Sequence, residues 1–231
     1  LPNGARDLTF TNVTLGGIPA VFATPQVNEI RELSDGSILV LGGFLQVNGV
    51  ARTNIIRLFS NGVVDTNFTP AVRGAFTAGA NSGFSMTLPG GQLLVQNAVS
   101  GGSMGSLYRL DANGKIEAIY GMTNSTSQVR AAAYQPDGKL VVALSEGVNT
   151  RITRYNVNGT IDTTFASPLL YKGTYRFSRL FIQPSGRIIA FGNFLRVDGS
   201  TLNALATNWV SCVVAVNPDG TPDTTFNQFV G

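Results

Sequence analysis

The chain has 231 residues, of which 43% are hydrophobic and only 13% are charged, and its net charge is +3. The basic residues are scattered singly, which argues against a nucleic-acid-binding surface, and the apolar stretches are too short and too often broken by glycine to span a bilayer. There is no histidine and only one cysteine, so the commonest general base, the commonest transition-metal ligand and an internal disulfide are all excluded.

A short phrase recurs along the chain, beginning with "NGARDLTF" at 3–10 and clearest in "NGTIDTTF" at 158–165 and "DGTPDTTF" at 219–226. In each copy a glycine is followed three residues later by an acid and six residues later by an aromatic residue. The five sets are Gly4–Asp7–Phe10, Gly62–Asp65–Phe68, Gly114–Glu117–Tyr120, Gly159–Asp162–Phe165 and Gly220–Asp223–Phe226. We expect the acid to bond to nearby backbone amides and the aromatic ring to pack between adjacent sheets.

A second phrase precedes each of the last four copies of the first: "LSDGSILVLG" (33–42), "LPGGQLLVQN" (88–97), "QPDGKLVVAL" (135–144) and "QPSGRIIAFG" (183–192). Its glycines predict tight turns that close through a left-handed residue, and they are Gly36, Gly91, Gly138 and Gly186. These glycines are spaced by 55, 47 and 48 residues. A repeat of about fifty residues is typical of β-propeller blades.

Apolar, β-rich runs follow each of these turns, and further strands are expected upstream at 29–33, 129–134 and 178–182 and downstream at 54–59, 105–110, 151–156 and 212–217. No ten-residue window has helical periodicity. Each repeat is therefore interpreted as a four-stranded antiparallel blade. The sequence predicts an all-β, propeller-like array in a single domain, 1–231, with repeats at 28–68, 82–120, 129–165 and 178–226 and a partial repeat at 1–10.

The phrases "QPDGKLVVAL" (135–144) and "RYNVNGTIDTTF" (154–165) resemble the bacterial delta-60 repeat family. The resemblance extends over 28–226 and is weakest at 82–120, where Glu117 and Tyr120 replace Asp and Phe. It implies β-propellers in secreted or surface-exposed bacterial proteins, often large and multi-modular, and it implies no known catalytic residues.

The partial repeat at the N-terminus lacks the other strands of a blade. A short strand is not stable alone, so it needs a strand to pair with, from 11–27, from the last blade or from elsewhere. We expect a partner outside the given sequence, in a longer open array, because Asp223 and Phe226 already occupy the equivalent place in the last blade. Closure into a four-bladed propeller is the alternative.

The acids allow a metal or catalytic interpretation, but the turns explain them more simply. Segments 111–117 and 217–223 place oxygen ligands around a glycine as calcium loops do, yet the distal Glu of an EF-hand is absent. Glu29, Glu32 and Glu146 have no assigned turn, and nothing in the sequence pairs them for glycoside hydrolysis. We therefore predict no metal, no cofactor and no enzymatic activity.

Two segments are rich in the residues that stack on sugars or anchor partner proteins, "SPLLYKGTYRF" (167–177) and "DGSTLNALATNW" (198–209). The candidate ligand-binding residues are Tyr171, Lys172, Tyr175, Arg176 and Trp209. For Trp209 a place in the core between blades is the favoured alternative.

Together these features predict a non-enzymatic extracellular module that acts as a binding or adhesion scaffold on a bacterial surface. Its expected partners are other protein modules or chains, or carbohydrate, with neither nucleic acid nor membrane insertion. The alternatives are a structural component of a larger assembly, such as a surface filament or a phage tail or fibre in a virion, and, third, a carbohydrate-active enzyme.

Overall fold

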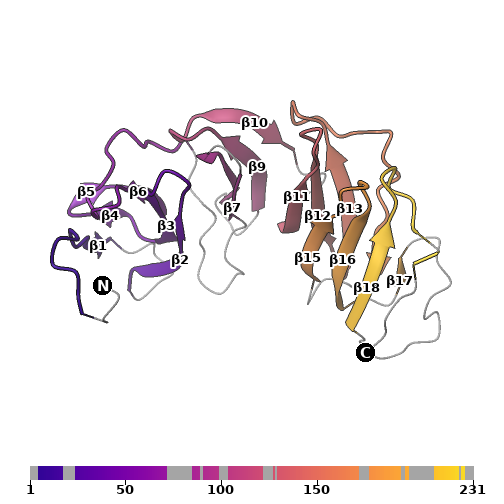
Figure 1. The fold of residues 1–231 in the computed structure, drawn as a ribbon, viewed down its shortest axis with the longest axis horizontal. Helices are drawn as coiled ribbons and strands as arrows, with labels where there is room; N and C mark the ends of the chain where they lie inside the picture. Colours follow the sequence, from indigo (N-terminus) through magenta and orange to yellow (C-terminus); the bar gives the residue numbers. More distant parts are fainter. Residues whose placement is uncertain are drawn as a thin grey trace. The chain divides into compact units, whose positions relative to one another are not determined.

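The structure is a computed structural model (Figure 1), and it describes residues 5–17, 24–71, 85–88, 91–98, 104–121, 127, 129–171, 177–193, 196–197, 211–223 and 225–226. Within these ranges the chain forms antiparallel β-sheets, so the predicted all-β class is confirmed. The same ranges contain no helix that is long and apolar enough to cross a membrane.

Two compact units divide the chain, Leu1–Ile119 and Tyr120–Gly231, and two of the four repeats fall essentially in each. Each unit is described by itself below. The single domain expected from the sequence stays a prediction.

The first unit contains one sheet for each of the first two repeats. The first repeat forms the sheet β2-β3-β6, made of β2 (Gln26–Glu32), β3 (Ile38–Gly43) and β6 (Ile55–Leu58). The second forms a four-stranded sheet of β7 (Ser85–Thr87), β8 (Leu93–Ala98), β9 (Met104–Leu110) and β10 (Ile116–Tyr120).

The second unit contains the sheets of the last two repeats. The third repeat contributes β11 (Val129–Tyr134), β12 (Leu140–Glu146) and β13 (Asn149–Tyr155), which β14 (Leu169–Tyr171) and β17 (Arg196–Val197) extend. The fourth forms the sheet β15-β16-β18, made of β15 (Phe177–Ile182), β16 (Ile188–Asn193) and β18 (Ser211–Val216).

The fourth position of the blade is a full strand only in the second repeat. In the other three it is a single bridging pair: Leu58 with Val64, Tyr155 with Ile161, and Val216 with Pro222. The chain bends there because the aspartate of the phrase bonds to the backbone two residues ahead. Glu117 has a longer side chain that bonds to Gln92 and Arg109 instead, and β10 continues as an extended strand.

A further pairing joins the segment after two of the aromatic residues, Phe10 and Phe165, to the loop of the following repeat. In the second unit β14 pairs with β17, Leu170 opposite Val197. In the first unit β1 (Leu15–Gly16) pairs in the same way with β4 (Gln46–Val47), which also pairs with β5 (Val50–Ala51). Residues 5–16 therefore behave as the end of a preceding repeat.

The glycine turns have the geometry that the sequence predicts. Gly36, Gly91, Gly138 and Gly186 have φ of 77°, 77°, 81° and 83°, and each donates its N–H to the carbonyl three residues earlier. Such positive φ values cost a residue with a Cβ atom about 1–2 kcal/mol.

Both faces of the central strands β3 and β12 are buried, which explains why these strands have continuous apolar runs. One cluster lies between β2-β3-β6 and β7-β8-β9 and includes Leu39, Leu41, Phe68 and Val95. Another lies between β11-β12-β13 and β15-β16-β18 and includes Val141, Ile152, Phe165 and Ile188. Phe68 and Phe165 therefore pack between two sheets, where the aromatic residue of the phrase was expected.

Candidate functional site

Each repeated aspartate closes a small turn with one carboxylate oxygen. The Oδ1 atoms of Asp65, Asp162 and Asp223 accept the backbone N–H two residues ahead, at 2.9, 3.0 and 2.9 Å. In the last two copies Oδ1 also accepts the hydroxyl of Thr164 or Thr225. All three carboxylates are buried, so this local bonding satisfies groups that water does not reach.

The second carboxylate oxygen of each aspartate meets an arginine. Arg57 Nε lies 2.8 Å from Asp65 Oδ2, and Arg154 Nε lies 2.8 Å from Asp162 Oδ2. In the last copy Ala215 stands where this arginine is expected, and Arg187 supplies the cation instead, at 2.7 Å from Asp223 Oδ2. The charge pair is thus kept although its arginine comes from a different strand.

The same arginines lie over the aromatic rings of the phrase. The guanidinium carbons of Arg57, Arg154 and Arg187 lie 5.0, 4.7 and 6.0 Å from the ring centroids of Phe68, Phe165 and Phe226. Cation–π contacts of this kind add to the attraction of the ion pair. We call each set an Arg–Asp–Phe cluster.

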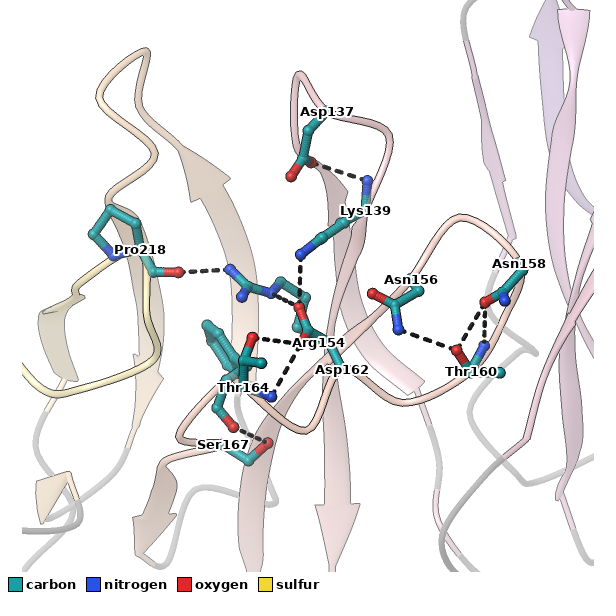
Figure 2. A network of polar contacts seen from close by, with 11 residues as sticks. Asp137, Lys139, Arg154, Asn156, Asn158, Thr160, Asp162, Thr164, Ser167 and Pro218 are labelled. Atoms are coloured by element: carbon teal, nitrogen blue, oxygen red, sulfur yellow. Dashed lines mark hydrogen bonds and ion pairs between the residues drawn. The ribbon is translucent and has the colours of Figure 1, made fainter.

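Asp162 has the most complete network, which Figure 2 shows. Lys139 Nζ lies 2.8 Å from Asp162 Oδ2, beside the Arg154 contact. The bond from Lys139, followed by that from the Thr164 hydroxyl, holds the pKa of Asp162 far below its ordinary value. The Thr225 hydroxyl likewise lowers the pKa of Asp223, although burial opposes it. Both carboxylates are therefore held ionised.

Backbone contacts join the clusters of Arg57 and Arg154 to a turn of the next repeat within their units. Arg57 Nη1 donates to the carbonyl of Ala112, and Arg154 Nη1 to that of Pro218 at 2.6 Å. The residue after the aromatic ring donates its N–H to the same type of turn: Thr11 to Asn61 at 2.7 Å, Thr69 to Asn113 at 3.4 Å, and Ala166 to Asp219 at 2.8 Å.

The glycine in these turns is required twice over. Gly62 and Gly220 have φ of +83° and +90°, and a Cβ atom on either would also meet the preceding segment. At Gly220 it would lie 2.6 Å from the backbone nitrogen of Ala166 and 2.9 Å from the Phe165 ring. At Gly62 it would clash with the carbonyl oxygen of Thr11 and lie 2.8 Å from the Phe10 ring. We call this arrangement the Phe–turn contact.

The partial repeat at the N-terminus makes the same Phe–turn contact as the full repeats. Residues 5–10 do not form a strand, and Phe10 lies against Gly62 of the first full repeat. Phe10, Val13 and Leu15 pack on a cluster that includes Val40 and Ile56. The segment is thus stabilised by the turn and face of the next repeat. The expected partner outside the given sequence stays a prediction; within the described residues the segment contacts the next repeat through the Phe10 ring and a turn.

The second repeat does not form an Arg–Asp–Phe cluster, because its phrase has Glu117 and Tyr120 in place of Asp and Phe. Tyr120 replaces Phe and packs edge-to-face on Tyr155, with ring centroids 5.6 Å apart. The hydroxyl of Tyr120 lies 2.8 Å from that of Tyr134, and the hydroxyl of Tyr155 donates to the carbonyl of Gly121 at 3.0 Å. Burial raises the pKa of Tyr155 to about 12.

Several of the remaining acids of the described ranges also have partners. Glu29 forms an ion pair with Arg31, and Glu146 with Arg151. In the two segments that resemble calcium loops, Asp111 and Asp219 accept backbone N–H groups. Within the described ranges no cluster of three or more His, Cys, Asp or Glu side chains has an arrangement that holds a metal ion.

Four of the five candidate ligand-binding residues, Lys172, Tyr175, Arg176 and Trp209, lie outside the described residues, and for Tyr171 only the backbone is described. Tyr171 ends β14 opposite Arg196 of β17. This pairing places side by side two strands, β14 and β17. They lead into the two segments that the sequence singled out, 167–177 and 198–209. Sequence reasoning did not bring them together, and it also missed the arginines, although an arginine precedes the acid by eight residues in three of the four full repeats.

A family model described as "Domain of unknown function (DUF5122) beta-propeller" matches residues 33–68 and 135–165, within the first and third repeats. The repeats are β-propeller blades. No curated protein matches the chain. The delta-60 resemblance remains a prediction.

Solved structures of similar shape include a protein of unknown function from Bacteroides caccae, with 14% identity and a TM-score of 0.47 over 92% of this chain and 69% of that one. A member of the duf4221 family from Bacteroides vulgatus is 8% identical, with a TM-score of 0.38 over 97% of this chain and 83% of that one.

Proposed function

We propose that this chain is a non-enzymatic β-propeller module of a bacterial extracellular or surface protein, and that it is a scaffold which binds a partner through segments between its strands. The Arg–Asp–Phe clusters support the scaffold part of this proposal. They neutralise the repeated carboxylates inside the blades, where the ionised groups stabilise the fold. The low charge of the chain and its polar uncharged residues suit an extracellular location.

One observation favours binding at a particular place, namely the length of the loop after β17. In the first repeat β6 begins at Ile55, eight positions after Val47. In the last repeat Val213, the counterpart of Ile55 in register, lies sixteen positions after Val197. Insertions that belong to one repeat commonly form the binding surface of repeat proteins.

The inserted residues include Trp209, and the pairing of β17 with β14 places their starting point beside Tyr171. Aromatic residues and arginine dominate the binding energy of many protein and carbohydrate sites. We therefore propose that Tyr171, Lys172, Tyr175, Arg176 and Trp209 belong to one binding surface for a carbohydrate or a protein module.

A glycan array of bacterial surface polysaccharide fragments tests this function. The full chain should bind a subset of the array, and Trp209→Ala and Tyr175→Ala should each weaken binding by about tenfold or more, as expected for aromatic anchors. Phe59→Ala is the matched control, because Phe59 is an exposed aromatic residue at the turn of the first repeat. Equal losses in all three variants, or unchanged binding in the first two, would contradict the proposed site. Cleavage of any bound glycan would contradict the non-enzymatic assignment.

A second candidate function is a structural part of a larger assembly. It is favoured by the exposed phenylalanines Phe181 and Phe191 on β15 and β16. Large apolar side chains clustered on one sheet face mark a surface that another protein covers.

A further inference from the structure

Arg130 of β11 is a half-buried cation that has no counter-charge within the described part of the chain. Its Nε atom is inaccessible to solvent and has no hydrogen-bond partner there. Burial lowers the pKa of this guanidinium, and no charged neighbour among the described residues opposes the effect. A charge that is removed from water without an opposite charge is costly, so an arginine in this position indicates that an anion binds to it.

The acids of the second unit are engaged elsewhere. The described ones and their partners are Asp137 with the N–H of Lys139, Glu146 with Arg151, Asp162 with Arg154, Asp219 with the N–H of Thr221, and Asp223 with Arg187. The chain has 13 acids, and Asp198 is the only one outside the described residues. Six arginines of the described ranges form ion pairs, namely Arg31, Arg57, Arg109, Arg151, Arg154 and Arg187. Arg130 differs from all six.

A β-bulge sets the position of this arginine. The register of β11 against β12 shifts between Val129 and Ala131, so Arg130 is the extra residue. The first and fourth repeats have the same bulge, with Asn28 and Ser178 as the extra residues. Bulges re-aim a side chain and are common beside functional sites. The bulge therefore belongs to the repeat, whereas the arginine distinguishes the third repeat.

Arg130 lies at the end of its sheet where the proposed binding surface begins. One row of paired residues crosses the sheet from β11 to β14: Val129, Leu144, Arg151 and Leu169. The first and last strands of this row are three interstrand spacings of about 4.8 Å apart, or roughly 14 Å. A chain of a few sugars spans this distance, so one oligosaccharide reaches from Arg130 to the end of β14.

The charge of the candidate binding segments also favours an anionic ligand. Lys172, Arg176 and Arg196 belong to these segments or to the strand that leads into them, and Asp198 is their single acid. An excess of positive charge raises the local concentration of anions and speeds their association. The planar fork of a guanidinium, in addition, matches the two oxygens of a carboxylate.

We propose that Arg130 binds the carboxylate of an acidic sugar, such as a uronic acid residue of a surface polysaccharide, whose neighbouring sugars contact the proposed binding surface. A carboxylate suits Arg130 better than a neutral sugar, because it supplies the opposite charge and accepts two parallel hydrogen bonds from the guanidinium. This inference rests on the proposed binding function and names its class of ligand.

Isothermal titration calorimetry of the full chain tests the ligand class, with a galacturonic acid oligomer and the same oligomer after reduction of its carboxyl groups to alcohols. Wild type should bind the acidic oligomer about tenfold or more tightly than the reduced one, as expected for one charge-assisted pair. Arg130→Met should bind both oligomers alike, whereas Trp209→Ala should weaken both equally. Arg179→Gln is the matched control: it removes the same charge at an exposed site on β15 and should keep the preference.

The melting temperature of the ligand-free protein gives a second readout. Arg130→Met should raise it by about 2 °C or more, because methionine has no charge to leave uncompensated. A lower melting temperature would overturn the proposal, since it would show that Arg130 is paired within the fold. The proposal would also fail if Asp198→Asn lowers the melting temperature in wild type but not in Arg130→Met, because Asp198 would then be the counter-charge.

An unchanged preference for the acidic oligomer in Arg130→Met would overturn the site, and equal stabilisation by acetate at the same carboxylate concentration would overturn the sugar. If circular dichroism shows that Arg130→Met does not fold, Arg130→Lys decides, because it keeps the charge without the fork and should lower the preference. Glycan binding that requires Trp209 but shows no preference for acidic glycans would overturn only this inference. Absence of binding to any glycan would overturn the proposed function as well.

Discussion

At the scale of single residues, the repeated aspartate closes a turn and pairs with an arginine. This arrangement is easily mistaken for a catalytic site. Asp162 is buried, ionised and surrounded by two cations, which is also how many catalytic carboxylates look. Its two oxygens are however occupied by Thr164, Arg154 and Lys139. A buried ion pair adds little net stability over an apolar pair, but removing one partner is costly. The cluster therefore fixes the position of Arg154 over Phe165.

Replacing this aspartate should therefore destabilise the protein. Asp162→Asn keeps an oxygen for Thr164 but leaves Arg154 and Lys139 without their counter-charge, so we expect the free energy of unfolding in urea to fall by about 2 kcal/mol. Asp7→Asn is the control, because Asp7 forms the same turn with Thr9 at an exposed site and should leave the urea midpoint unchanged. Similar losses in both variants would show that the turn, rather than the ion pair, carries the stability.

The same carboxylates predict how stability depends on pH. The folded state lowers the pKa values of Asp162 and Asp223, so the folded protein binds fewer protons than the unfolded chain, whose aspartates titrate near 3.9. Their stabilisation should be complete above that value and decrease as pH falls further, toward the lower pKa values of the folded state. Urea unfolding at neutral pH and near pH 3 should show a smaller difference for Asp162→Asn than for wild type. An equal difference would assign the acid sensitivity to other groups.

At the scale of elements, the sequence predicts what is local and misses what is not. The turns at Gly36, Gly138 and Gly186 follow from a few adjacent residues, since only their φ is at issue. The arginine partner of Asp223 does not follow from adjacent residues, because Arg187 is distant in sequence. It lies where the other repeats have Ser37, Gln92 or Lys139. The sequence predicted a longer fourth strand than most repeats have. An aspartate that bonds two residues ahead bends the chain after one bridging pair.

The two kinds of glycine turn should respond differently to alanine. At Gly36 a Cβ atom would meet nothing within 4 Å, so Gly36→Ala carries only the strain of positive φ, about 1 kcal/mol. At Gly220 the same change also displaces Ala166 and Phe165, so the free energy of unfolding should fall by about 3 kcal/mol or more. Urea unfolding of the two variants measures the difference. Equal losses would mean that the Phe–turn contact adjusts freely and does not hold neighbouring repeats together.

At the scale of the whole molecule, the repeat pattern predicted the blades and their order but left binding open. Periodicity constrains the buried face of each strand, because within each unit one repeat covers the same surface of the other. The inserted loop after β17 has no such constraint, so the repeat pattern does not predict its role. Nor does periodicity reveal where compact units begin: the chain divides at Ile119–Tyr120, within the phrase that is most altered.

This division predicts separate opening of the two units. Each has an apolar cluster of its own, with Phe68 in one and Phe165 in the other. Phe68→Ala should cost about 3–5 kcal/mol locally, because it leaves a cavity between two sheets. Native-state hydrogen exchange should then lose protection at Leu39 and Val95 while Val141 keeps it, and Phe165→Ala should give the reverse pattern. Loss of protection at all three amides in both variants would mean that the two units unfold together, as the single domain expected from the sequence requires.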